Sequence, residues 1–101
     1  MPYGLSETVI EKLISVFSSN SEIDEVIIFG SRAKGNYKEG SDIDISLKGA
    51  GITSSLIRKI ELEIDNLYLP YKVDLINYND IIEPMLTDHI DRVGICIYKK
   101  T

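Results

Sequence analysis

The stretch Gly30–Asp44, GSRAKGNYKEGSDID, decides the fold. It follows the apolar run VIIF at residues 26–29, which is short, β-branched and ended by a glycine. Such a run is typical of a buried strand. Residues 42–47 then alternate between polar and apolar, which predicts a half-buried strand. We therefore expect two strands joined by a polar connection over residues 30–41, with a short helical turn followed by a loop.

Patterns on either side of this stretch predict helices and a third strand. Apolar residues recur every three or four positions from Leu5 to Phe17, which predicts an amphipathic helix with Ser6 as its N-cap. We expect a second helix from Ser54 or Ser55 to about Leu67, a strand over 72–76, a last helix over 84–92 that Gly94 ends, and a tail or edge strand over 95–98. The sequence thus predicts one α/β (α+β) domain over residues 1–101, with a small mixed sheet flanked by helices.

Length and charge exclude several classes of protein. The 101 residues fit a single domain, and the net charge of −5 disfavours dedicated nucleic-acid binding. No apolar run is long enough to cross a membrane, and the N-terminus does not read as a signal peptide, so we expect a cytoplasmic protein. The single cysteine, Cys96, lies in an apolar run and is expected to be a small buried side chain.

Asp42 and Asp44 point to the same face of their predicted strand, because side chains two residues apart share a face. Two carboxylates held this close repel each other unless a cation lies between them, and Mg²⁺ prefers oxygen ligands. Asp74, on the third predicted strand, would join them if the two strands are neighbours. Three such carboxylates can hold two metal ions about 4 Å apart, as in phosphoryl or nucleotidyl transfer. A solvent-exposed strand face is the alternative interpretation of a bare Asp-x-Asp.

Gly30 and Ser31 favour the functional interpretation. A glycine between a strand and a helical turn lets a ligand approach the backbone, and the first amides of the turn point outward toward an anion. The hydroxyl of Ser31 adds a donor, and Arg32 and Lys34 can offset the charge of a triphosphate. The P-loop pattern is absent, because Asn36 follows Gly35 where a lysine is required.

Residues 30–47, GSRAKGNYKEGSDIDISL, together with VDLI at residues 73–76, resemble the nucleotidyltransferase superfamily that includes DNA polymerase beta and kanamycin nucleotidyltransferase. The shared pattern is Gly-Ser, a spacer, Ser/Thr-Asp-x-Asp, and a lone aspartate on a later strand. The short chain resembles the minimal nucleotidyltransferase (MNT) branch, which is often an antitoxin paired with a HEPN-domain toxin. Lys34 departs from the pattern, since relatives often have arginine there.

The resemblance implies roles for individual residues. Gly30 and Ser31 would hold the β- and γ-phosphates of ATP, with Arg32 and Ser41 also in the nucleotide site. Two Mg²⁺ ions would be bound by the three catalytic carboxylates, Asp42, Asp44 and Asp74. The reaction implied is AMP transfer to a hydroxyl, such as a tyrosine of a HEPN toxin.

The resemblance also implies assembly with that toxin, or a homodimer, because a second domain that grips the acceptor is missing. Two alternatives stay open: an antitoxin that neutralises its toxin by binding alone, and an enzyme that adenylylates a small molecule. His89, the only histidine, is expected to have a surface or capping role.

Overall fold

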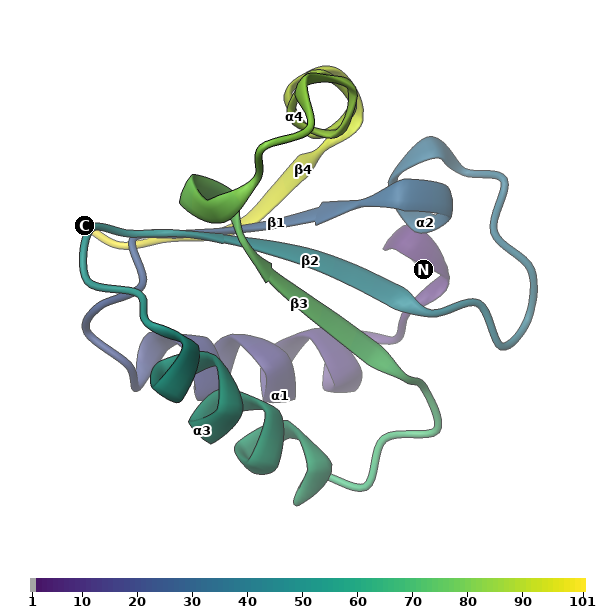
Figure 1. Ribbon diagram of the computed structural model, residues 1–101. Helices are drawn as coiled ribbons and strands as arrows, with labels where there is room; N and C mark the ends of the chain where they lie inside the picture. The colour runs from purple at the N-terminus through teal and green to yellow at the C-terminus, as the bar shows by residue number, and fades with distance from the viewer. Residues whose placement is uncertain (1) are drawn as a thin grey trace.

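The computed structural model describes residues 2–101 and shows a four-stranded sheet with helices on both faces (Figure 1). The elements in chain order are η1 (Pro2–Gly4), α1 (Glu7–Ser18), β1 (Glu25–Phe29), α2 (Gly30–Lys34), β2 (Ile43–Lys48), α3 (Ser54–Asp65), β3 (Val73–Asn77), η2 (Tyr78–Asp80), α4 (Pro84–Val93) and β4 (Ile95–Lys99). This arrangement confirms the expected α+β class.

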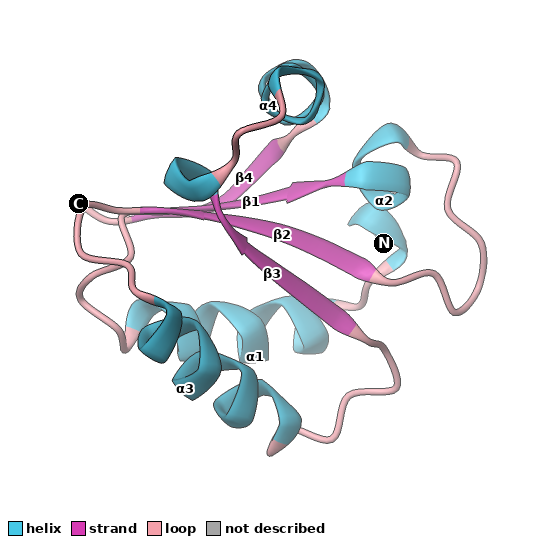
Figure 2. Cartoon of the chain, in the orientation of Figure 1, coloured by secondary structure: helices cyan, strands magenta, loops and turns pink. Residues whose placement is uncertain are grey.

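The strand order is β3-β2-β1-β4, so that the two strands around the Gly30–Asp44 stretch lie at the centre. β1 pairs antiparallel with both β2 and β4, whereas β2 and β3 are parallel. The sheet is therefore mixed, as the sequence predicted. α1 and α3 lie along one face, and α4 crosses the other face near β1 and β4 (Figures 1 and 2).

The main core lies between the sheet and the pair of helices α1 and α3. Ile43, Ile45 and Leu47 of β2 are fully buried there against Phe17 of α1 and Ile60 of α3. Since alternate strand residues face opposite sides, Asp44 and Ser46 point toward the face that α4 covers in part. The apolar face of β2 thus fixes the side on which its carboxylate projects.

Helix ends follow ordinary capping chemistry, with two differences from expectation. Ser6 caps α1 as predicted, but α3 is capped by Thr53, whose Oγ1 accepts a hydrogen bond from the Leu56 amide at 3.1 Å. Threonine is a good N-cap, and it precedes both serines that were expected to fill this position. α3 also ends at Asp65 rather than near Leu67, in a turn that leads to Tyr68 at a φ of 52°.

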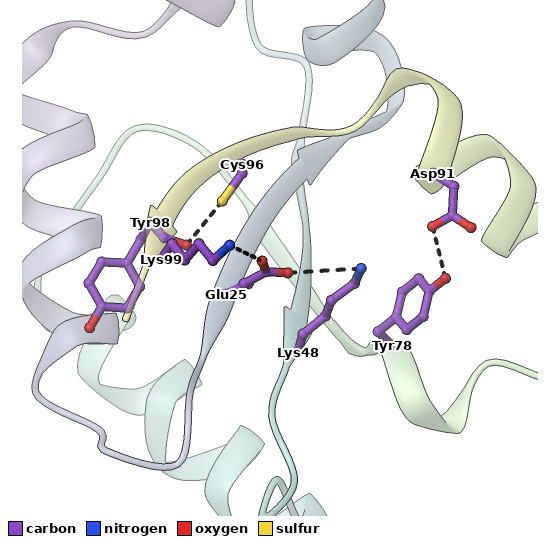
Figure 3. A network of polar contacts seen from close by, with 7 residues as sticks. All are labelled: Glu25, Lys48, Tyr78, Asp91, Cys96, Tyr98 and Lys99. Atoms are coloured by element: carbon purple, nitrogen blue, oxygen red, sulfur yellow. Dashed lines mark hydrogen bonds and ion pairs between the residues drawn. The ribbon is translucent and has the colours of Figure 1, made fainter. Parts of the chain in front are cut away.

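The prediction for Cys96 is wrong, because the thiol is exposed. β4 is an edge strand, and Cys96 lies on its outward side, where the thiol donates a hydrogen bond to the Tyr98 carbonyl at 3.2 Å (Figure 3). Glu25 of β1 lies within 3.7 Å of Lys99 of β4 and within 3.9 Å of Lys48 of β2, so that one carboxylate links three strands.

α4 is tied to the rest of the fold by a polar contact as well as by packing. Tyr78 of η2 donates a hydrogen bond from its hydroxyl to Oδ1 of Asp91 at 2.8 Å (Figure 3). Ile90 of α4 is almost completely buried. The Asp91 carboxylate raises the pKa of Tyr78, because it accepts the phenolic proton in a hydrogen bond. Within residues 2–101, no helix is both long and apolar enough to cross a membrane.

Candidate functional site

Gly30 forms the junction between β1 and α2. Its φ is +74°, a backbone conformation that L side chains rarely adopt. A Cβ atom added at Gly30 would overlap Oδ2 of Asp44. Glycine is therefore required here both for the turn and for the close approach of the Asp44 carboxylate.

Asp44 and Asp74 lie side by side on neighbouring strands. The parallel register of β2 and β3 pairs Asp44 with Asp74, and the antiparallel register of β1 and β2 pairs Asp44 with Phe29, the residue before Gly30. The expected adjacency of the two strands is confirmed. Asp42 precedes β2 instead of starting it, and its side chain is exposed.

The pKa of Asp44 is raised above its usual value, first by burial and then by the charges of Asp74 and Asp42. A bound cation would relieve the repulsion that Asp44 experiences from these two charges. The charges of the two other predicted aspartates, Asp42 and Asp74, therefore act on Asp44 near the starts of β2 and β3.

The chemistry of these aspartates fits a hard divalent cation, although their side chains are not arranged around one. Within residues 2–101, no group of three His, Cys, Asp or Glu side chains lies close enough to hold an ion. The Lys72 ammonium lies 3.7 Å from Oδ1 of Asp74, and the two side chains are 73% and 44% exposed. A surface pair of this kind is weak and does not prevent a stronger cation from taking its place.

Arg32 lies inside the protein rather than at its surface. Its side chain is only 3% exposed, and its guanidinium donates to the Ser41 carbonyl at 2.8 and 3.2 Å and to the Tyr3 carbonyl at 2.9 Å. The rings of Tyr37 and Tyr71 lie 5.3 and 4.8 Å from it. This geometry differs from the phosphate contact that the sequence predicted, because the guanidinium is already engaged with the backbone.

Ser41 also has a structural partner. Its hydroxyl accepts a hydrogen bond from the Lys38 amide at 2.8 Å, and its own amide donates to the Lys38 carbonyl at 3.0 Å. Together with the two bonds from Arg32, these contacts fix the backbone immediately before Asp42. Ser31, by contrast, is half-buried as the second residue of α2.

Sequence reasoning missed the place of His89. Its Nε2 accepts a hydrogen bond from the Gly30 amide at 3.2 Å, and its ring meets the edge of Phe29 at a centroid distance of 6.1 Å. The expected surface or capping role is replaced by a contact with the candidate site. No local sequence pattern around His89 predicts this contact, because α4 places the histidine beside a residue that is 59 positions earlier in the chain.

A groove of about 780 Å³ lies between the C-terminal half of α3 and the start of β3, and of the three aspartates only Asp74 lines it. Asp74 lines this groove together with Tyr68, Tyr71, Lys72 and Arg58. Because β3 is an edge strand, a large ligand can approach Asp74 from outside the sheet.

Known structures share this fold. The chain matches a solved structure described as a minimal nucleotidyltransferase at 26% identity and a TM-score of 0.69, with 94% of this chain and 95% of the other covered. A toxin–antitoxin structure with AMP-PNP matches at 20% identity and a TM-score of 0.72, covering 96% of this chain and 76% of the other. A Shewanella oneidensis complex of a tri-AMPylated HEPN toxin with an MNT antitoxin gives 15% identity and a TM-score of 0.72, covering 95% and 74% of the two chains. This chain therefore has the nucleotidyltransferase fold.

Sequence comparison gives the family. The model of the family "Polymerase beta, Nucleotidyltransferase" matches residues 11–101. A Methanocaldococcus jannaschii protein, MJ1215, which is described as a protein adenylyltransferase, is 37% identical over 75 residues, which is 72% of this chain and 85% of that protein. The chain belongs to the polymerase-beta nucleotidyltransferase family, as the Gly-Ser and Asp-x-Asp pattern predicted.

Proposed function

We propose that this chain, as one minimal domain, transfers AMP from ATP to a hydroxyl group of a partner protein. The observation that carries the proposal is the pairing of Asp44 with Asp74 directly beside the Gly30 turn. A place for carboxylate-bound cations and a place for phosphates are thereby adjacent, as nucleotidyl transfer needs. The description of the M. jannaschii relative as a protein adenylyltransferase supports a protein acceptor.

Different residues of the chain have different roles in the proposed reaction. Gly30 and Ser31 hold the β- and γ-phosphates. The amide and hydroxyl of Ser31 donate to them, and Gly30, whose own amide donates to His89, lets the backbone approach them closely. Asp74 accepts the proton of the acceptor hydroxyl, whose oxygen attacks the α-phosphorus. The bond from the α-phosphorus to the bridging oxygen breaks, and pyrophosphate leaves with the electron pair. Asp42, Asp44 and Asp74 would hold two Mg²⁺ ions, which supply charge neutralisation when bound.

We propose a HEPN toxin as the partner and one of its tyrosines as the acceptor. The fold neighbours support this, since one is a complex of an MNT antitoxin with a HEPN toxin that carries three AMP groups. The open approach to Asp74 at the β3 edge also suits a protein acceptor better than a small molecule enclosed by the site. Association of this chain with the toxin would supply the walls that the edge of the sheet lacks.

The test is transfer of label from α-³²P-ATP, with Mg²⁺, to a purified HEPN toxin encoded beside this chain. We expect labelled toxin with the wild type and with Asp24→Asn, a control at an exposed aspartate just before β1 that does not line the groove beside Asp74. Asp44→Asn and Asp74→Asn should reduce labelling by at least ~10³-fold, since each removes a charge essential to the chemistry. Equal neutralisation of the toxin by wild type and Asp44→Asn, with no label transferred, would instead establish an antitoxin that acts by binding alone.

A further inference from the structure

His89 and Gly30 are joined across the fold, although they lie 59 residues apart in the chain. The Gly30 amide donates to Nε2 at 3.2 Å, and the histidine ring meets Phe29 edge-on at an interplanar angle of 81°. Nε2 acts as the acceptor, so the proton of the neutral ring lies on Nδ1. One histidine therefore contacts both residues that form the junction between β1 and α2.

The helix that carries His89 is held firmly enough to fix the ring. Ile90, the next residue, is 2% exposed, and Gly94 ends the helix so close to the sheet that an added Cβ would lie 2.6 Å from Ile27. Asp91 accepts the hydrogen bond from Tyr78 on the other side of the helix. These contacts leave α4 little freedom to move away from Gly30.

Gly30 in turn lies against the Asp44 carboxylate, because that carboxylate fills the space that a Cβ at residue 30 would need. A glycine fixes its own peptide orientation poorly, because it has access to more backbone conformations than any other residue. A hydrogen-bond acceptor on its amide removes that freedom. The chain of contacts thus runs from α4 through His89 and the Gly30 peptide to Asp44.

We propose that His89 is a positioning residue, which fixes the Gly30 peptide and thereby the first turn of α2 and the Asp44 carboxylate. The effect on nucleotide binding rests on the proposed function, whereas the effect on the Gly30 peptide does not. His89 acts here through its acceptor nitrogen and does not touch the reacting atoms.

The test compares two substitutions at this position. His89→Gln keeps an acceptor, because its Oε1 lies about as far from Cα as Nε2 does, and His89→Phe keeps the aromatic contact but has no acceptor. In ¹H–¹⁵N spectra of the protein without ligand, we expect His89→Phe to move the Gly30 amide proton upfield and to speed its exchange with solvent. His89→Gln should keep both near the wild-type values, and Asp88→Asn, on the exposed side of α4, should change neither.

The second readout is binding of ATP with Mg²⁺. We expect His89→Phe to weaken ATP binding about tenfold and His89→Gln to stay within about threefold of wild type. Thermal unfolding checks that each variant is folded; if His89→Phe is not, His89→Met replaces it, since it also lacks a strong acceptor. An unchanged Gly30 resonance in the variant without an acceptor overturns the proposal. Failure of the wild type to bind ATP would overturn the proposed function, while the spectra would still decide the role of His89.

Discussion

The carboxylate of Asp44 occupies the space that a side chain at residue 30 would need. An added Cβ at Gly30 would overlap Oδ2 of Asp44, and the φ of Gly30 is +74°. Two separate parts of the sequence pattern, Gly-Ser and Asp-x-Asp, are therefore parts of a single packed arrangement. A larger residue at position 30 would displace the Asp44 carboxylate, and the carboxylate at its present place leaves no room for a side chain at position 30.

Gly30→Ala should destabilise the protein by about 2 kcal/mol, because backbone strain at its positive φ is joined by a smaller cost of displacing the Asp44 carboxylate. Gly35→Ala is the matched control: Gly35 has a φ of +87°, but an added Cβ would meet nothing within 4 Å. It should cost only the strain, about 1 kcal/mol. Urea unfolding measures both values.

The double substitution Gly30→Ala with Asp44→Ala separates the two effects. Removing the carboxylate should recover most of the clash, so the combined loss should be smaller than the sum of the single losses. Strictly additive losses would show that the clash is relieved in some other way.

Asp44→Asn should stabilise the metal-free protein at neutral pH. The pKa of Asp44 in the folded state lies above the ordinary aspartate value of 3.8, so the folded state binds more protons than the unfolded state between these two pKa values. Stability is therefore lost as the pH rises through this window, and the loss persists above it. Asparagine carries no such charge, so its advantage should grow across the window.

The measurement is the free energy of unfolding of wild type and Asp44→Asn from about pH 3 to about pH 8, in the presence of a chelator. The difference should be small below pH 3.8, where Asp44 is protonated in both states. Asp65→Asn, at an exposed position, should show no comparable change. A difference that is constant with pH would contradict the electrostatic cause.

Arg32→Lys should destabilise the protein by about 2–4 kcal/mol despite keeping the charge. A lysine cannot reproduce the planar fork that donates to the carbonyls of Ser41 and Tyr3, and the site is almost completely buried. Lys34→Ala in the same short helix is exposed and should change stability by less than about 0.5 kcal/mol. Chemical denaturation followed by circular dichroism compares the two.

Ser46→Ala should stabilise the protein by about 1 kcal/mol. Ser46 is fully buried in β2, and in residues 2–101 its hydroxyl is the one buried side-chain polar atom without a hydrogen-bond partner. Removing an unsatisfied buried hydroxyl recovers part of its desolvation cost. A lower midpoint of thermal unfolding for Ser46→Ala would show that this hydroxyl has a partner after all, such as a bound water.

Local patterns were enough to predict the elements that build the candidate site. The run before Gly30 and the alternation after Ser41 predicted β1 and β2, and the isolated Asp74 between apolar residues predicted the face of β3. These signals are local because strand periodicity is set by burial of one face. Pairing of Asp44 with Asp74 then followed from a single assumption, that β2 and β3 are neighbours.

Long-range contacts account for what the sequence did not predict. Nothing near His89 indicates that α4 packs beside Gly30, and nothing near Arg32 indicates that its side chain turns inward between Tyr37 and Tyr71. Cys96 was expected to be buried because its neighbours are apolar, but β4 lies at the edge of the sheet. Each of these depends on the tertiary arrangement rather than on residue spacing.

The order of the strands has a kinetic consequence. The central pair β1 and β2 is joined by residues 30–42, whereas β3 reaches β2 only after the longer crossover over residues 49–72, which contains α3. Contacts between residues near in sequence cost less chain entropy and tend to form sooner. We expect pulsed hydrogen exchange during refolding to protect amides of Val26–Ile28 before those of Val73–Leu75. Gly30, Asp42 and Asp44 would then be in place while Asp74 is still on an unfolded segment.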